Sequence, residues 1–465
     1  MHQDHAALRL KPLEALIVTL IILGGISYSI IFAGSVPHIP VVFAIMGLFA
    51  YGLMKKVSVK ELENGLVEGA KSGLGAIFIF FFIGMLISSW MASGTIPTFI
   101  YLALEAVNGK FFYAIVFVVA SVIGMSIGSS LTTAATLGVA FMGVSSALDL
   151  SEAITAGAVI SGAFFGDKMS PLSDTTNLAS ATVKVDLFDH IKNMAWTTVP
   201  AFGISLVLFA IVSPDEAASN FTKIALLKET LLIQGLVHWY SLIPFAILAL
   251  LAIKKVSAII TLSSGILSSL LIAIFVQDSF GVQKMLSFLF SGYVSESGLE
   301  EVDSLLTRGG MESMMFSISL VLLALSMGGL FLKLGILPAL LEGIKGILAR
   351  VPALIASAAG TAIGINFLVG EQYLSILLTG NAFREPFERA GLQSKNLSRI
   401  LEDAGTVVNP LVPWSVCGVF LTSVLGVDTL AYLPFAFFCL LSPIITLIYG
   451  LTGIKIAKIN EKAAA

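Results

Sequence analysis

Residues 162–179 read GAFFGDKMSPLSDTTNLA, a stretch that places charged side chains inside an otherwise apolar chain. Of the 465 residues, 57% are hydrophobic and 12% are charged, and the mean hydropathy is +0.97. Apolar runs of this composition recur from residue 13 to residue 452 and predict a polytopic helical membrane protein. Ionisable groups are costly at membrane depth and mark functional sites there, so Asp167, Lys168 and Asp174 are the first candidates.

The same stretch predicts a broken helix. An apolar segment covers residues 152–184, and Pro171 removes a backbone hydrogen bond in its middle. We therefore expect a transmembrane helix interrupted between about residues 166 and 176. A second interruption is expected in the segment 397–424, at EDAGTVVNPLVPWS (402–415).

Two further apolar segments, 111–146 and 352–382, are too long for one span. Each is interrupted halfway by glycine and small polar residues, at GMSIGSSLTT (124–133) and GTAIGINFLVGEQ (360–372). Each segment forms either two tight spans or one re-entrant hairpin. The polar tips favour the hairpin, because irregular backbone is tolerated at depth only where it lines a cavity.

The predicted fold class is thus an all-α polytopic membrane protein with two re-entrant hairpins, two interrupted transmembrane helices and about ten full spans. Lysine and arginine concentrate in cytoplasmic loops, and the basic clusters of this chain all fall inside if both termini are cytoplasmic. The acidic loop 277–310 then falls outside.

Weak internal similarity relates the two halves of the chain. At an offset of 241 residues four positions match, and at an offset of 236 Gly124, Gly128 and Asp167 match Gly360, Gly364 and Asp403. The matching apolar segments begin on opposite sides of the membrane, which predicts an inverted repeat, the architecture of many secondary transporters. We divide the chain into N-terminal helices and a cytoplasmic connection (1–68), a first repeat (69–213), linking helices with the acidic external loop (214–309), and a second repeat with the C-terminus (310–465).

The polar residues of the broken segments and hairpin tips offer carboxylate, amide, hydroxyl and carbonyl oxygens, the ligands that a hard cation such as Na⁺ prefers. A carboxylate that holds either a proton or Na⁺ binds the two competitively, which suits an exchanger. The candidate ion-binding and proton-coupling residues are Asp167, Asp174, Asp403, Glu371, Ser173, Thr175, Thr176, Asn177, Ser129, Thr132, Asn366 and Asn409. For Na⁺ itself we expect Asp174, Asn177, Asn366 and Asn409.

Each candidate also has a structural interpretation. Asp174 can be the N-cap of the resumed half-helix. Lys168 can bind an anion or only neutralise a buried carboxylate, and because neighbouring helical positions diverge it need not pair with Asp167. Glu402 can face the cytoplasmic rim and have no specific role. Cys417 and Cys439 form no metal-binding pattern and are expected in the core.

The motif GAFFGDKMSPLSDTTNLA resembles the signature of the NhaC family of bacterial Na⁺/H⁺ antiporters, and the likeness extends to chain length and the paired broken segments. The resemblance implies two clamshells that bind Na⁺ and, in some members of the wider superfamily, a carboxylate substrate. One would contain Ser129, Thr132, Asp174, Thr175 and Asn177, and the other Asn366, Glu371 and Asn409. A similar branch of the family exchanges malate and protons for Na⁺ and lactate.

The leading hypothesis is therefore Na⁺/H⁺ exchange across the bacterial cytoplasmic membrane, and the alternative is Na⁺- and H⁺-coupled malate/lactate exchange on the same fold. An ion channel ranks below both. An enzyme is not expected, because no hydrolase motif occurs, and no nucleotide-binding motif supports an ATP-driven pump. No cofactor is expected beyond Na⁺ as the transported ion, and with a formal net charge of −3 nucleic acid is not an expected partner. The lipid bilayer is the expected surrounding, and a homodimer is left open.

Overall fold

The computed structural model describes residues 6–106, 111–214, 221–254, 256–277, 281–299, 302–303, 306–344 and 350–459. Within these ranges the chain is helical and has two isolated β-bridges but no strand. The helices before the first hairpin are α1 (Pro12–Ile31), α2 (His38–Met54), α3 (Val59–Ser72), α4 (Leu74–Ala92) and α5 (Thr95–Ala106). The linking helices are α11 (Leu187–Val212), α12 (Phe221–Ile233), α13 (Ile243–Ile253), α14 (Ala258–Val276) and α15 (Val282–Ser291), and α17 (Met315–Lys333) and α18 (Ile336–Ile344) follow them.

Seven of the described helices are long and apolar enough to cross a membrane, or up to nine if two bent pairs each count as one span. Three shorter apolar helices accompany them: His38–Met54, Phe112–Ile127 and Trp239–Ile253. The chain is therefore a multi-pass membrane protein, as its composition predicts. The expected number of about ten spans stays a prediction.

Both long glycine-interrupted segments form helical hairpins. The first joins α6 (Phe112–Ile127) to α7 (Ser130–Thr133), a π-helical turn (Ala134–Gly138) and α8 (Val139–Ala147). The second joins α19 (Val351–Val369) to α20 (Gln372–Arg389). Each turn is made by a glycine in the left-handed region, Gly128 with φ +70° and Gly370 with φ +75°, where other residues are strained. Each glycine is followed by a helix N-cap, Ser129 or Glu371, whose side chain accepts a backbone hydrogen bond.

Both interrupted helices are present; the first break is shorter than expected, and the second matches the expected range, because regular α-helix ends at Ile400 and resumes at Val416. The first separates α9 (Glu152–Met169) from α10 (Asp174–Thr182), so Asp167 and Lys168 still belong to the last turn of α9. In the second, α21 (Ser394–Ile400) continues as a π-helix, η6 (Leu401–Thr406), and a short 3-10 turn, η7 (Asn409–Leu411). The chain then bends by 47° into α22 (Val416–Leu425).

The equivalent turns and caps of the two halves are separated by a different number of residues than the sequence comparison predicted. Each interrupted helix resumes at a serine N-cap, Ser173 before α10 and Ser415 before α22. These two serines, like the two hairpin glycines and the two hairpin N-caps, lie 242 residues apart in the numbering. The offset of 236 is therefore wrong for these elements, because it matched glycines of similar sequence context and not equivalent turns. In the new register Asp167 corresponds to Asn409, not to Asp403.

Close backbone contacts hold the first hairpin against its broken helix. A Cβ atom at Gly162 would come within 2.5 Å of the Phe117 carbonyl oxygen, and one at Gly166 within 2.6 Å of Gly124. Small residues spaced four apart let two membrane helices approach this closely. The pairing of α6 with α9 therefore fixes where the hairpin tip meets the break.

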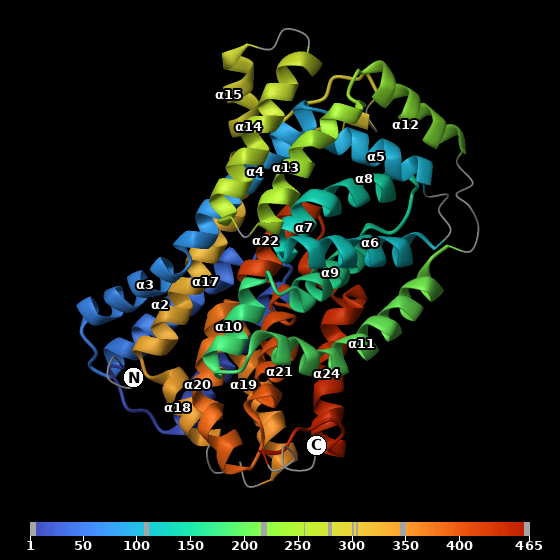
Figure 1. Cartoon of the computed structure of the whole chain (residues 1–465). Coiled ribbons are helices and arrows are strands. Elements are labelled where there is room, and N and C mark those ends of the chain that lie inside the picture. The colour runs from blue at the N-terminus through green and yellow to red at the C-terminus, as the bar shows by residue number, and fades with distance from the viewer. Residues whose placement is uncertain are drawn as a thin grey trace.

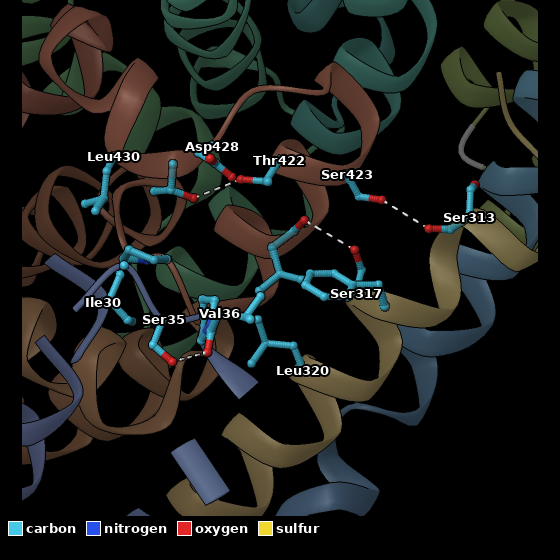
Figure 2. Close-up of a pocket in the computed structure, with 16 residues that line it drawn as sticks. Ile30, Ser35, Val36, Ser313, Ser317, Leu320, Thr422, Ser423, Asp428 and Leu430 are labelled. Atoms are coloured by element: carbon cyan, nitrogen blue, oxygen red, sulfur yellow. Dashed lines mark hydrogen bonds between the residues drawn. The ribbon is translucent and has the colours of Figure 1, made fainter. Parts of the chain in front are cut away.

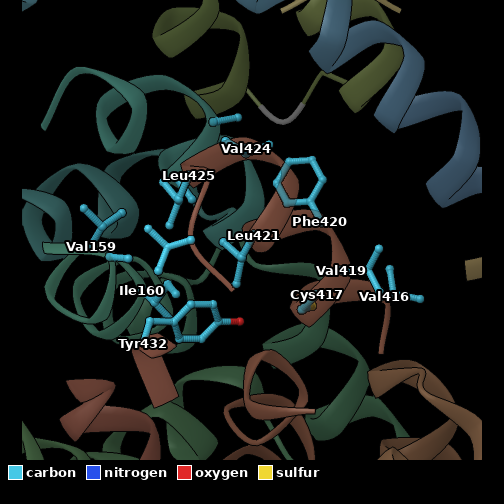
Figure 3. Packing of buried hydrophobic residues seen from close by; sticks show 14 of the residues in the cluster. Val159, Ile160, Val416, Cys417, Val419, Phe420, Leu421, Val424, Leu425 and Tyr432 are labelled. Atoms are coloured by element: carbon cyan, nitrogen blue, oxygen red, sulfur yellow. The ribbon is translucent and has the colours of Figure 1, made fainter. Parts of the chain in front are cut away.

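The core of the molecule surrounds α22. Figure 3 shows Phe420, Leu421 and Leu425 of α22 packed near Val159 and Ile160 of α9, with Tyr432 alongside. The Tyr432 hydroxyl donates to the Pro410 carbonyl at 2.5 Å, so this buried hydroxyl is satisfied. Cys417 and Cys439 are free and buried, as expected of core residues.

The turns of the two hairpins and the two breaks lie toward the middle of the molecule. Figure 1 shows α4, α5 and α12–α15 at one end and α18–α21 and α24 (Phe437–Thr452) at the other, with α7, α9, α10 and α22 between them. The outer helices carry exposed apolar side chains, such as Leu271 and Phe275 on α14. Such faces suit contact with lipid.

Candidate ion-binding site

Asp167 connects the first hairpin to the first broken helix. It lies on the last turn of α9 and is 5% exposed. Its Oδ2 atom accepts hydrogen bonds from the backbone N–H of Ser130 at 3.1 Å and from the Ser130 hydroxyl at 2.7 Å. Ser130 belongs to the hydroxyl-rich tip GSSLTT that was expected at the site, but it was not one of the candidate ion-binding residues. The hairpin tip thus supplies two donors to a buried acid.

The polar residues of the first break satisfy much of its own backbone. Ser173 is the N-cap of α10 and accepts from the Thr176 N–H, so Asp174 is the first helical residue and not the cap. The Thr176 hydroxyl donates to the Lys168 carbonyl at 3.1 Å across the break. The Asn177 amide donates to the carbonyls of Pro171 and Ser173 at 3.0 and 2.7 Å. These hydrogen bonds order the break, and they do not involve Asp174, which is exposed.

A cavity of about 550 Å³ lies at this break. Four of the predicted residues line it: Ser129, Thr132, Asp174 and Asn177. The hydroxyls of Ser129 and Thr132 lie 3.0 Å apart. The rest of its polar lining includes Ser257 and Thr261, which come from the start of α14, a linking helix that the sequence did not associate with the site. The cavity thus brings together oxygens from the hairpin tip, the broken helix and α14.

Asn366, Glu371 and Asn409 form a second group, which is buried and internally bonded. The Asn409 amide donates to Asn366 Oδ1 at 2.8 Å, and Asn409 Oδ1 accepts from the Cys417 N–H at 3.0 Å. The Asn366 amide donates to the Gly405 carbonyl at 2.6 Å. Glu371 caps α20 by accepting from the Leu374 N–H at 2.7 Å. These contacts attach the second hairpin to the second broken helix, as Asp167 and Ser130 do in the first half.

The four residues expected to bind Na⁺ therefore occur as two pairs. Asp174 and Asn177 line the cavity, whereas Asn366 and Asn409 are 0% exposed and bond to each other. Asp174, Glu371 and Asp167 all lie within electrostatic range of the Tyr373 hydroxyl, so Tyr373 lies near both groups. Whether one ion uses both pairs stays a prediction.

Lys168 forms an ion pair with Asp403, and both side chains are 0% exposed. Asp403 also accepts hydrogen bonds from the hydroxyls of Thr197, at 2.8 Å, and Thr446. The Lys168 ammonium lies 5.6 Å from the centre of the Phe438 ring. Three donors therefore surround the Asp403 carboxylate, and its negative charge balances Lys168 across the two halves of the chain.

A second cavity, of about 430 Å³, adjoins α22. Figure 2 shows Ser313 and Ser317 of the segment that begins α17 opposite Thr422 and Ser423 of α22, with Asp428 nearby. The turn between α1 and α2 completes its lining. None of the predicted site residues is among the described residues that line this cavity. Each interrupted helix thus has a cavity beside it.

Paired hairpins, broken helices and buried acids at the breaks are the features of a secondary transporter. Comparison with known proteins is specific: residues 162–454 match the Na⁺/H⁺ antiporter family. The chain is 42% identical to the Na⁺/H⁺ antiporter NhaC of Alkalihalophilus pseudofirmus over 91% of each chain. The protein therefore belongs to the Na⁺/H⁺ antiporter family.

Other relatives carry different names. The chain is 39% identical to the arginine/ornithine antiporter ArcD of Halobacterium salinarum, over 85% of this chain and 82% of that protein. It is 32% identical to the malate-2H⁺/Na⁺-lactate antiporter of Bacillus subtilis, over 86% of each chain. All three relatives are antiporters, but they differ in what they exchange.

Proposed function

We propose that this protein exchanges Na⁺ for H⁺ across the bacterial cytoplasmic membrane, with both termini in the cytoplasm. The observation that carries the proposal is the cavity that unites Ser129, Thr132, Asp174 and Asn177. Its oxygens suit Na⁺, and its single acid suits competition between Na⁺ and a proton. Asp167 lies directly before the break and is bonded to the hairpin tip, and it is the second acid that takes part in transport.

The charge of the cavity favours a cation as substrate. Among the described residues that line it, Asp174 is the one acidic side chain, and no lysine or arginine occurs. Lys168, which could have bound an anion, is already paired with Asp403. An organic anion would therefore enter the cavity beside a carboxylate and without a basic partner, which is unfavourable.

One feature favours the organic-acid alternative. The amino end of α14, at Ser257 and Ala258, faces the cavity, and the positive end of a helix can bind a carboxylate. Malate/lactate exchange is therefore the second candidate function. Exchange of a cationic amino acid, as in the Halobacterium relative, also suits an acid-lined cavity and deserves a test with arginine.

We further propose that the two halves form an inverted repeat and that ions reach the site alternately from the two sides. The paired glycine turns and serine caps, 242 residues apart, support the repeat. In the predicted topology the Asp174 cavity adjoins the basic Lys254 loop on the cytoplasmic side, and the cavity beside α22 adjoins the external turn at Ser35. Transport would then exchange access between these two cavities.

The test is proton flux in proteoliposomes on addition of Na⁺, measured without organic substrates, with malate outside and lactate inside, and with arginine. We expect Na⁺ alone to drive proton flux, and Asp174→Asn to abolish it. Asp189→Asn is the matched control, because Asp189 is an exposed acid on the first turn of α11. Flux that requires malate and lactate, or arginine, would replace the Na⁺/H⁺ assignment, and full flux in Asp174→Asn would refute the site.

A further inference from the structure

Glu402 is a buried acid whose carboxylate has no hydrogen-bond partner among the described residues. It lies on the π-helix η6 and is 0% exposed. Neither of its carboxylate oxygens completes a hydrogen bond within the described part of the chain. An ionised carboxylate in such a place would bear its full desolvation cost, and a buried acid avoids that cost by keeping its proton. This environment therefore favours the neutral carboxylic acid over the carboxylate at Glu402.

The adjacent residue shows the opposite environment. Asp403 accepts from Lys168 and from two threonine hydroxyls, so it is stabilised as a carboxylate. Because side chains of consecutive helical residues diverge, Glu402 does not share these donors. The two neighbouring acids thus have distinct surroundings: Asp403 is paired with Lys168, and no cation among the described residues is paired with Glu402.

The charges around Glu402 disfavour the loss of its proton. Lys168, Asp167 and Asp403 all act on it electrostatically. Lys168 and Asp403 cancel each other, so the loss of a proton from Glu402 would leave one uncompensated negative charge close to Asp167. Helices α10, α19, α20, α21 and α24 pack against η6. Of their titratable residues, Arg399 on α21 lies within electrostatic range of Asp403, the neighbour of Glu402, and of Tyr449 on α24.

A second polar group without a hydrogen-bond partner in the described part of the chain, the Thr406 hydroxyl, lies on the same π-helical turn as Glu402. The Thr406 hydroxyl, 1% exposed, is close enough to influence the carboxyl, yet it also lacks a hydrogen-bond partner among the described residues. The Val407 N–H bonds to the Glu402 carbonyl, the i to i+5 pattern of a π-helix. Such single-turn π segments are frequent at functional sites. Two unsatisfied oxygen-bearing groups on one turn are costly in a structural role alone.

We propose that Glu402 carries the transported proton: it is protonated in the conformation described here and ionises when the site opens to water. The inference rests on the proposed Na⁺/H⁺ exchange and adds a division of labour to it. Na⁺ then binds at the Asp174 cavity, and the transported proton binds at a separate carboxyl on the second broken helix, which replaces direct competition of the two ions at Asp174.

The test compares Glu402→Gln with unmodified protein and with Glu388→Gln, an exposed glutamate on α20, in proteoliposomes. Glutamine has the shape and neutral charge of the protonated acid, so the variant is expected to fold. Two fluxes are measured: proton movement driven by Na⁺, and exchange of radiolabelled Na⁺ for unlabelled Na⁺. We expect Glu402→Gln to lose the first to the level of empty liposomes and to retain the second, while Glu388→Gln retains both.

Each other outcome decides the question. Retention of both fluxes in Glu402→Gln would overturn the proposal, and loss of both would assign the residue to Na⁺ binding or to structure. If the unmodified protein shows no Na⁺-driven proton flux, the proposed function itself fails.

Infrared spectroscopy of the unmodified protein tests the protonation state without a flux assay. The carbonyl stretch of a buried protonated carboxyl is expected at neutral pH, and it should be absent in Glu402→Gln. If no such band distinguishes the two proteins, Glu402 is ionised and the proposal is wrong.

Discussion

Breaking the ion pair between Lys168 and Asp403 should destabilise the protein strongly. Asp403→Asn leaves the Lys168 ammonium 0% exposed and without its carboxylate, beside the neutral amide and the Phe438 ring, whose centre lies 5.6 Å away. Lys168→Met leaves the Asp403 carboxylate with two hydroxyl donors, from Thr197 and Thr446. In both cases a buried charge loses its counter-charge, which typically costs about 3–5 kcal/mol.

The contacts that remain in each variant predict which one loses more stability. Asp403 retains two donors when Lys168 is removed, so Lys168→Met should lie near the lower end of that range, and Asp403→Asn near the upper end. The double variant carries neither buried charge. It should therefore be less destabilised than the sum of the two single variants, by a coupling of about 1–3 kcal/mol.

Equilibrium unfolding in mixed detergent micelles measures these free energies. Lys192→Met, on the exposed surface of α11, is the control and should remain within about 0.5 kcal/mol of the unmodified protein. The reasoning is refuted if the single variants cost less than about 1 kcal/mol, or if their effects add within about 0.5 kcal/mol in the double variant. Either result would mean that the two charges are not mutually dependent.

Three further predictions concern other contacts. Ser130→Ala removes the hydroxyl that donates to Asp167 at 2.7 Å and should lower the unfolding free energy by about 1.5–3 kcal/mol in the same assay; no change would mean that this hydrogen bond does not hold the hairpin tip. Gly166→Ala forces a Cβ to within 2.6 Å of the α6 backbone and should cost about 1–3 kcal/mol, whereas Gly203→Ala, with nothing within 4 Å, should be neutral; equal effects would contradict the close packing. Hydrogen bonds from the Ser58 hydroxyl and then its N–H lower the pKa of Glu61 in the capping box of α3, so the acid stabilises the helix above about pH 4.5 and loses this effect as the pH falls through its lowered pKa. Hydrogen exchange in the first turn of α3 should therefore be faster in Glu61→Gln at neutral pH and equal at acidic pH, and a difference that persists in acid would refute the charge-based explanation.

Local sequence rules predicted the irregular elements well. Glycine and proline act on their own backbone, so the hairpins at Gly128 and Gly370 and the break at Pro171 could be placed from the sequence. The gathering of polar residues in the first half was also predictable, because Ser129, Thr132, Asp174 and Asn177 lie within two short motifs that meet at one cavity.

Contacts between the halves were not predictable in the same way. Asp403 was chosen as an ion-binding acid, but the structure pairs it with Lys168, which lies 235 positions earlier in the chain. Glu402 was considered for the cytoplasmic rim, and the structure buries it completely. Hydropathy averages over a segment and does not tell which side of a helix meets the protein interior, so these two adjacent acids could not be distinguished.

By itself the sequence determined that the chain is a bundle of membrane helices, where its backbone turns and breaks, and which oxygens gather at those places, because apolar length, glycine, proline and capping residues act locally. Only the tertiary structure decided which acid is neutralised, which lines a cavity and which is left without a partner. Those roles depend on side chains brought together from distant helices, and the electrostatic cost of a charge is set by those neighbours and by its distance from water.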